Sequence, residues 1–227
     1  MKQFYLMKQL VAILIFVLVP VVVSSQRLVF HAGGGWASHY GGSSKSVGAF
    51  KIGASVEFEM SQKLTIEPGL LYFSKGWKDH DKTVTLYDDN GNEVLDNNGN
   101  VRTAQMNVTS KTTYIVLPVM FNYYIPLTLP HYIYLSAGPY VAYGIGGKVR
   151  VSGDTSQYGA ARFYYDNDTF DQSTVHRFDA GVSVGVGYEF NRLINAGIEG
   201  NFGLTDVTTY GRKNFSVMLT LGYRIPF

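Results

Sequence analysis

From residue 27 onward, hydrophobic and polar residues alternate along the chain with a period of two. This alternation predicts β-strands that have one apolar and one polar face. The last run is the most regular, and its apolar face consists of Phe215, Val217, Leu219, Leu221, Tyr223, Ile225 and Phe227. The pattern predicts eight strands, near residues 27–38, 50–59, 63–75, 111–126, 131–149, 178–190, 194–205 and 213–227.

The connections between these runs alternate in length. The short ones fall at 61–62, 126–130 and 191–192. The others are mostly longer and polar, at about 39–46, 76–110, 150–173 and 206–211. Short turns at one end and long loops at the other are typical of an outer-membrane β-barrel. We therefore predict an all-β fold, an eight-stranded antiparallel up-and-down transmembrane barrel with long extracellular loops at about 76–110 and 150–173.

The first long loop contains two Asn-Gly pairs, in Asp-Asn-Gly-Asn at 89–92 and Asn-Asn-Gly-Asn at 97–100. Asn-Gly supplies the positive φ of a type I′ turn, so we expect a hairpin extension above the barrel. A calcium loop is the alternative, because oxygen ligands are offered by Asp88, Asp89, Asn90 and Asp96. The segment lacks the ligand spacing and the terminal Glu of a calcium-binding loop. We therefore predict no metal and no cofactor.

Alternation alone does not say which face of the sheet points outward. An eight-stranded barrel has an interior just wide enough for side chains to fill, so small and paired charged residues suit it better than a full aromatic set. The polar faces carry such charges, at Lys51, Glu57, Glu59, Glu67, Asp179, Glu189, Glu199 and Arg224. Aromatic residues gather near strand ends, as membrane-interface girdles do, at Trp36, Tyr40, Tyr72, Trp77, Tyr123, Tyr188, Phe190, Tyr223 and Phe227. We predict apolar faces outward; the alternative is a soluble periplasmic barrel with inverted faces and a bound hydrophobic ligand.

The inward charges have two interpretations. One is a conduction path, and the other is a salt-bridged plug, which an eight-stranded barrel favours because it leaves no aqueous channel. Buried charges persist only when they are paired and hydrogen-bonded. Glu57, Glu67 and Glu189 should lie toward the short-turn end, where Arg224 and Lys63 are the available cations. We predict a structural interior network of Lys51, Glu57, Glu67, Asp179, Glu189, Glu199 and Arg224.

Three prolines lie inside predicted strands: Pro68, Pro118 and Pro139. Proline cannot donate a hydrogen bond to a neighbouring strand and is normally found at edges or bulges. A closed barrel has no edges, so we expect a bulge or a missing hydrogen bond at each proline.

The N-terminus has the composition of a secretory signal peptide. A basic segment with Lys2 and Lys8 precedes fourteen apolar residues, 10–23, which are too few to span a membrane as a helix, and small residues follow. We predict a signal peptide at 1–25 and a barrel domain at 26–227. Without Lys2 and Lys8, the 19 basic residues fall to 17 and balance the 17 acidic ones, so nucleic acid is not an expected partner. The absence of cysteine excludes disulfides and thiolate chemistry.

Several segments resemble a known family. The C-terminal pattern of Tyr223, Ile225 and Phe227 is similar to the signal by which the barrel-assembly machinery recognises outer-membrane proteins. The central segments resemble the PorT-like outer-membrane β-barrel family of Gram-negative bacteria; they are Ile-Val-Leu-Pro at 115–118, Ala-Gly-Pro-Tyr at 137–140, Arg-Phe-Asp-Ala-Gly at 177–181 and Gly-Val-Gly-Tyr-Glu-Phe at 185–190. The resemblance implies an outer-membrane location, no catalytic residues and Pro118 and Pro139 as family features. Some members of the family support protein secretion.

The remaining residues leave three classes of function open. A structural or interaction barrel would bind a protein partner through its long loops, where an aromatic cluster offers a contact surface: Tyr158, Phe163, Tyr164, Tyr165 and Phe170. Packing of that loop on the barrel rim is the alternative for the cluster. A lipid-modifying enzyme would need a convergent Ser, His and acid, for which Ser173 and His176 are the nearest pair. A small-solute pore would need measurable conductance. We predict a non-enzymatic barrel whose partners are outer-membrane lipid, the assembly machinery and a loop-bound protein.

Overall fold

The computed structural model describes residues 26–40, 44–88, 90–154, 163–171 and 173–226. The predicted signal peptide, Tyr158 and Phe227 lie outside these residues. Within the described part of the chain, no helix is long and apolar enough to span a membrane. The strands are β1 (Gln26–Tyr40), β2 (Val47–Glu59), β3 (Leu64–Thr85), β4 (Thr103–Pro126), β5 (His131–Asp154), β6 (Phe163–Asp168), β7 (Phe178–Phe190), β8 (Ile194–Gly203) and β9 (Lys213–Pro226).

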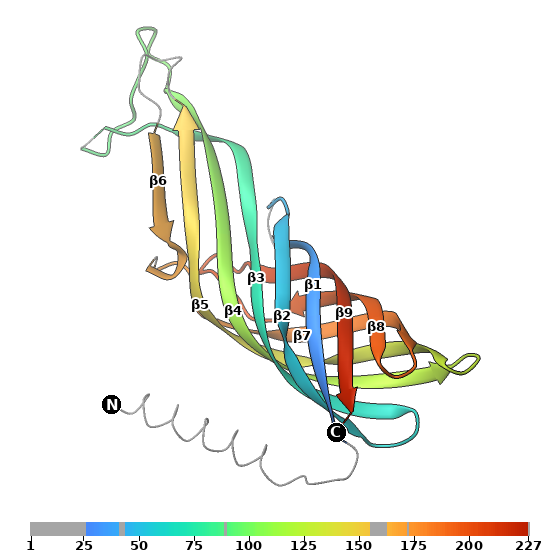
Figure 1. Ribbon diagram of the computed structural model, residues 1–227. Helices are drawn as coiled ribbons and strands as arrows, with labels where there is room; N and C mark the ends of the chain where they lie inside the picture. Colours follow the sequence, from blue (N-terminus) through green and yellow to red (C-terminus); the bar gives the residue numbers. More distant parts are fainter. Residues whose placement is uncertain (1–25, 41–43, 89, 155–162, 172, 227) are drawn as a thin grey trace, which may run out of the picture.

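Eight of these strands close into an antiparallel ring (Figure 1). Each strand from β1 to β5 pairs with the next, β5 pairs with β7, and β7, β8 and β9 follow in order. The ring closes where β1 pairs with β9 from Arg27 opposite Pro226 to Tyr40 opposite Lys213. β6 stands outside the ring and pairs with the upper part of β5. The predicted eight-stranded up-and-down barrel is therefore confirmed.

Three strands are longer than the sequence pattern indicates. β3, β4 and β5 have 22, 24 and 24 residues, whereas β7 and β8 have 13 and 10. A tilted strand of 9–11 residues is enough to cross a bilayer, so the extra length continues beyond it. Figure 1 shows these strands rising as a sheet on one side of the ring. Much of the two predicted loops, 76–110 and 150–173, is thus β-structure; we call the part of β3–β6 beyond the ring the extension.

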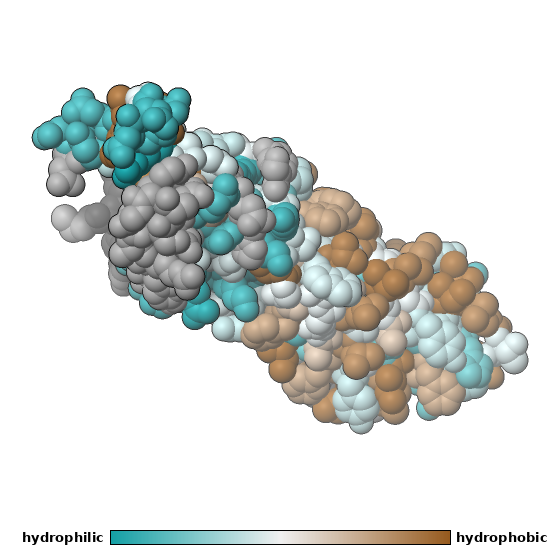
Figure 2. Space-filling view, turned by 90° about the horizontal axis from the view of Figure 1, so that it is seen from above, coloured by the Kyte–Doolittle hydropathy of each residue, from teal (hydrophilic) through white to brown (hydrophobic). Residues whose placement is uncertain are grey.

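The apolar faces of the ring strands point outward, as predicted. On β9, Leu219 and Leu221 are each 61% exposed, while Met218 and Arg224 on the other face are 0% and 2% exposed. Figure 2 shows hydrophobic residues gathered over the ring and hydrophilic residues over the extension. The interior also holds aromatic side chains, although the sequence pattern predicted the bulky aromatic residues on the outside. Phe73, Tyr114, Tyr124 and Tyr140 are all buried among the inward charges.

The three prolines lie on adjacent strands and share one gap in the sheet. Pairing of β3 with β4 stops after Pro68 opposite Val119 and resumes at Leu71 opposite Val116. Pairing of β4 with β5 stops after Pro118 opposite Tyr140 and resumes at Phe121, on the other side of Pro139. In both strand pairs the register is the same on either side of the gap. Backbone hydrogen bonds are therefore missing, but neither strand contains an inserted residue. The sheet tolerates the prolines by local loss of pairing, and its irregularities of register lie elsewhere, at 79–82 and 113–114.

The turn at the tip of the hairpin extension is of a different type from the one predicted. At 96–100 the amide of Gly99 donates to the carbonyl of Asp96, and only Gly99, at φ +82°, has positive φ among these residues. This is a type I turn followed by a left-handed glycine, not the predicted type I′ turn. The type I′ conformation occurs instead between β7 and β8, where Asn191 and Arg192 have φ values of 54° and 53°. The hairpin extension is present, but its tip uses the other common geometry.

Candidate functional site: the charged barrel interior and its rim

At the short-turn end, one arginine joins two buried carboxylates. Arg224 on β9 donates to Glu57 of β2 at 2.9 Å and to Glu189 of β7. Tyr124 on β4 donates its hydroxyl to Glu57 at 2.8 Å. The carboxylates are 0% and the guanidinium 2% exposed, so the charges are shielded from water. These contacts link β9 to β2, β7 and β4, none of which pairs with β9 in the sheet.

Two further arginines at this end were not predicted. Arg27 lies 2.7 Å from Glu59 and 3.7 Å from Glu57. Arg192 lies 3.5 Å from Glu189, and its guanidinium stacks 4.0 Å from the ring centre of Tyr124. These contacts hold Arg192 in its left-handed conformation, which is costly for a residue with a side chain. Lys63, the other predicted cation, is exposed on the turn between β2 and β3.

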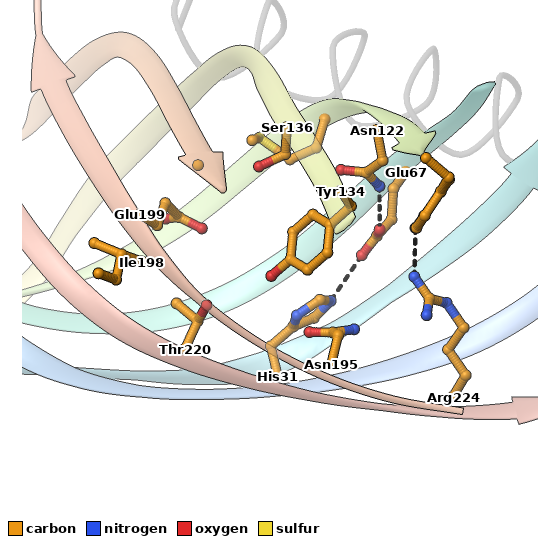
Figure 3. Close-up of a pocket in the computed structure, with 13 residues that line it drawn as sticks. His31, Glu67, Asn122, Tyr134, Ser136, Asn195, Ile198, Glu199, Thr220 and Arg224 are labelled. Atoms are coloured by element: carbon orange, nitrogen blue, oxygen red, sulfur yellow. Dashed lines mark hydrogen bonds and ion pairs between the residues drawn. The ribbon is translucent and has the colours of Figure 1, made fainter. Parts of the chain in front are cut away.

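The middle of the barrel contains two more ionic groups, and the one around Glu67 is seen in Figure 3. Glu67 on β3 accepts hydrogen bonds from Asn122 at 2.7 Å and from Ser55 at 2.5 Å, and His31 of β1 lies 2.8 Å away. Lys51 on β2 lies 2.5 Å from Glu199 on β8. Cavities of about 50 Å³ each border these groups. Such spaces are suited to a few water molecules rather than to a solute.

Nearer the extracellular end, Asp179 on β7 pairs with Lys75 on β3 at 2.7 Å. Asn214 also donates to Asp179, at 2.8 Å. The ammonium of Lys75 lies 4.6 Å from the ring centre of Tyr114 and 5.4 Å from that of Tyr140, which places it in an aromatic cage. The alternation of residues predicted Asp179 as an interior residue but did not predict Lys75. Lys75 is separated from Glu67 by an even number of positions on the same strand, so the two side chains share a face. This spacing could have predicted that Lys75 points inward.

The top layer closes the barrel mouth. Arg212 lies 3.4 Å from Asp79 and donates to Ser44 at 2.9 Å. Its guanidinium also lies 5.1 Å from the ring centre of Trp77, which in turn lies 5.6 Å from the His39 ring. Trp77 is therefore part of the interior and not of an outer aromatic girdle as expected. The charged interior as a whole forms successive layers that join opposite walls of the barrel.

The predicted aromatic contact surface is divided by the structure. Phe163, Tyr164 and Tyr165 lie on β6 in the extension. Phe170 instead turns inward from the 3₁₀ helix Thr169–Asp171, and its ring meets Tyr114 edge to face at 6.0 Å. The guanidinium of Arg177 covers the other side of the Phe170 ring at 4.7 Å. For Phe170 the structure therefore shows packing on the barrel rim rather than an exposed contact.

The residues considered for chemistry do not converge. The Nδ1 of His176 donates to the carbonyl of Asp206 at 2.9 Å, and both His176 and Ser173 are exposed. Across the described residues, no group of three His, Asp or Glu side chains is placed to hold a metal ion. The Asp88 carboxylate accepts backbone hydrogen bonds from Asn92 and Asn90, and these bonds lower its pKa below the ordinary value of 3.8. Its oxygens thus stabilise a turn.

The final strand presents the predicted assembly residues on its outer face. Tyr223 and Ile225 of β9 are 48% and 39% exposed, on the side of the sheet that faces lipid. A closed ring with an apolar exterior and a charged interior defines a transmembrane β-barrel.

Comparison with known proteins agrees with this class. Residues 37–209 match the family model described as outer membrane protein beta-barrel domain, and the chain belongs to this family. The protein is therefore located in the outer membrane of a Gram-negative bacterium. No curated protein sequence matches the chain.

The chain is also similar to solved outer-membrane proteins at low sequence identity. Neisserial surface protein A is 17% identical, with a TM-score of 0.40, and the match covers 89% of this chain and 97% of that one. The attachment invasion locus protein of Yersinia pestis is 11% identical, with a TM-score of 0.39, over 89% and 100% of the two chains. The N-terminal barrel domain of Pseudomonas aeruginosa OprF is 12% identical, with a TM-score of 0.33, over 88% and 97%.

Proposed function

We propose that the protein is a non-enzymatic outer-membrane barrel with a plugged interior that acts as a structural or interaction protein through its extracellular extension. The observation that carries this proposal is the stack of ionic layers. Lys51 with Glu199 and Lys75 with Asp179 link strands that are three places apart in the ring, and Arg224 of β9 reaches Tyr124 of β4, on the opposite wall, at the short-turn end. A plug of this kind leaves the extension as the part available to a partner.

The chain resembles the PorT-like family, and we propose that it belongs to this group and has an accessory role in secretion or a surface interaction. The proposal includes export by the signal peptide at 1–25 and assembly through the C-terminal pattern of β9. A pore is less favoured because paired side chains occupy the interior. A lipid-modifying enzyme is less favoured because Ser173 and His176 are exposed and His176 is bonded to a backbone carbonyl.

Two measurements test this function. In planar bilayers, the purified barrel should show no stable single-channel conductance, and reproducible conductance steps would contradict the plug. Shortening the extension by removing residues 86–102, beyond the last paired residues Thr85 and Thr103, should preserve the barrel and abolish capture of a protein partner from the native envelope. A matched deletion is made within residues 155–162. Capture of the partner that survives both deletions would contradict a role for the extension.

A further inference from the structure

A small polar cavity lies under the barrel mouth, apart from the cavities in the middle of the barrel. Its volume is about 30 Å³, and its lining includes His39 of β1, Ser110 of β4 and Thr169 of the 3₁₀ helix. These three residues are 8%, 1% and 1% exposed. Each has one buried polar atom without a hydrogen-bond partner in the described part of the chain, namely the Nδ1 of His39, the Oγ of Ser110 and the Oγ1 of Thr169. Burying polar atoms unpaired is costly, so their gathering around one cavity points to a ligand.

The hydrogen bonds of the ionic layer determine the role of the His39 ring. Asn214 donates from its amide nitrogen to Asp179 at 2.8 Å, so the amide oxygen is the atom that faces His39. This oxygen lies 3.1 Å from Nε2 of His39, which is therefore the donor. Burial disfavours a charge on the ring, so Nε2 carries its single proton and Nδ1 has a free lone pair. The cavity thus presents one acceptor and two hydroxyl groups, which can both donate and accept.

Size and charge limit what the cavity can hold. A volume of about 30 Å³ has room for one or two water molecules. The ammonium of Lys75 lies 4.6 Å from the ring centre of Tyr114, and the guanidinium of Arg212 lies 5.1 Å from that of Trp77. Both rings line the cavity, so these two cations disfavour a third positive charge there. An anion is disfavoured because a lone pair faces the cavity and because both cations already pair with carboxylates.

We propose that the cavity binds a water molecule that joins His39, Ser110 and Thr169. The water donates to Nδ1 of His39 and makes its other hydrogen bonds with the two hydroxyl groups. Three hydrogen bonds are the usual number for a buried water. The chain of hydrogen bonds from Asp179 through Asn214 and His39 then continues to the 3₁₀ helix. Through this water, the interior ionic layer holds the segment that covers the barrel mouth.

The experiment measures hydrogen exchange of the backbone amides of residues 169–177 in the protein folded in neutral detergent micelles. Thr169→Val keeps the shape of the side chain and removes its hydroxyl group. If the water is bound, it loses one hydrogen bond, and the exchange rate of this segment should rise about fivefold. If the hydroxyl group is buried without a partner, its removal relieves a desolvation cost, and exchange should be unchanged or slower. Unchanged or slower exchange would therefore overturn the proposal.

Ser110→Ala tests the same water from β4 and should also speed exchange of residues 169–177. Combining it with Thr169→Val should have less effect than the two single changes predict together, because both hydroxyl groups bond to one molecule. Strictly independent effects would contradict a shared water. Ser216→Ala is the matched control, since the Ser216 hydroxyl is also buried and unpartnered among the described residues but does not border this cavity. If Ser216→Ala speeds exchange equally, loss of any buried hydroxyl has this effect and the proposal fails.

A high-resolution crystal structure tests the occupant directly. It should show one density peak within hydrogen-bond distance, about 2.7–3.2 Å, of the Nδ1 of His39 and the hydroxyl oxygens of Ser110 and Thr169. A cavity without density would refute the proposal. Crystals grown with bromide in place of chloride distinguish the alternative ligand, because an anomalous bromide signal in the cavity would show an anion site instead of a water site.

Discussion

Arg224 shows how one residue can organise a barrel interior. It bonds to Glu57 and Glu189, which come from strands that are not its neighbours in the sheet, and to the hydroxyl of Tyr124 at 2.5 Å. Removing charges from water is costly, and the cost is recovered only when each charge has partners in good geometry. Loss of the arginine would leave two carboxylates buried close together.

We expect Arg224→Leu to lower the free energy of unfolding by roughly 3–5 kcal/mol, because a buried ion pair is broken on one side only. The measurement is the midpoint of denaturant unfolding of the barrel in lipid vesicles. Lys63→Leu is the control, since Lys63 is exposed on a turn, and it should unfold close to the parent. An unchanged midpoint for Arg224→Leu would show that Arg224 is not the structural partner of these carboxylates.

The sequence predicted individual interior residues where alternation was strict and missed them elsewhere. Asp179 and Glu189 were identified because the run at 178–190 alternates without exception, and β7 has these bounds. Lys75 was missed because Leu71 and Phe73 share its face, so that the inward side of β3 did not appear polar. Arg192 was missed because it lies in a turn, where periodicity carries no information about direction.

At the scale of elements, the ends of β3, β4 and β5 were the least predictable feature. Within the membrane one face of a strand meets lipid and the other meets the interior, which produces the apolar–polar alternation. In the extension, polar residues occur on both faces, as at Lys78 and Asp79 on β3, and the alternation is lost. These segments therefore have the composition of loops although they pair as strands, from Lys78 opposite Thr109 to Thr85 opposite Thr103.

The 3₁₀ helix Thr169–Asp171 closes the mouth because Gly144 leaves room for a ring. A Cβ atom at Gly144 would lie 2.0 Å from the Phe170 ring. We expect Gly144→Val to displace Phe170 and to increase cleavage by an added protease between residues 169 and 177 several-fold, while the barrel stays folded. The measurement is limited proteolysis with mapping of the cut sites.

Gly146→Val is the matched control for this variant. Gly146 lies two residues further along β5, and a Cβ atom there would meet no other atom within 4 Å. Its proteolysis pattern should equal that of the parent. If Gly144→Val is cut no faster than Gly146→Val, the packing of Phe170 does not hold this segment on the barrel mouth.

At the scale of the whole molecule, closure of the ring depends on the seam between β1 and β9. Gly35 is inward-facing at this seam, and a Cβ atom there would lie 2.1 Å from the carbonyl oxygen of Val217. The neighbouring Gly34 is outward-facing, and a Cβ atom there would meet no other atom within 4 Å. The two glycines thus offer a matched test of closure.

We expect the unboiled parent to migrate faster on a gel than the boiled parent, because a closed barrel resists detergent unfolding. Gly35→Val should greatly reduce the fast-migrating band, since the seam cannot close without displacement of the backbone, whereas Gly34→Val should retain it. Equal folding of both variants would mean that the β1–β9 seam does not control closure. A parent that shows no shift and fractionates as a periplasmic protein would contradict the closed transmembrane barrel.

The unequal strand lengths give the protein a defined direction within the plane of the membrane. β3, β4 and β5 rise on one side of the ring, whereas β8 and β9 end lower on the other (Figure 1). A neighbouring membrane protein that approaches from the β8–β9 side can bring its own extracellular part over the barrel mouth. One that approaches from the β3–β5 side meets an upright sheet. The rotation of the barrel about the membrane normal therefore determines which neighbours can reach its mouth.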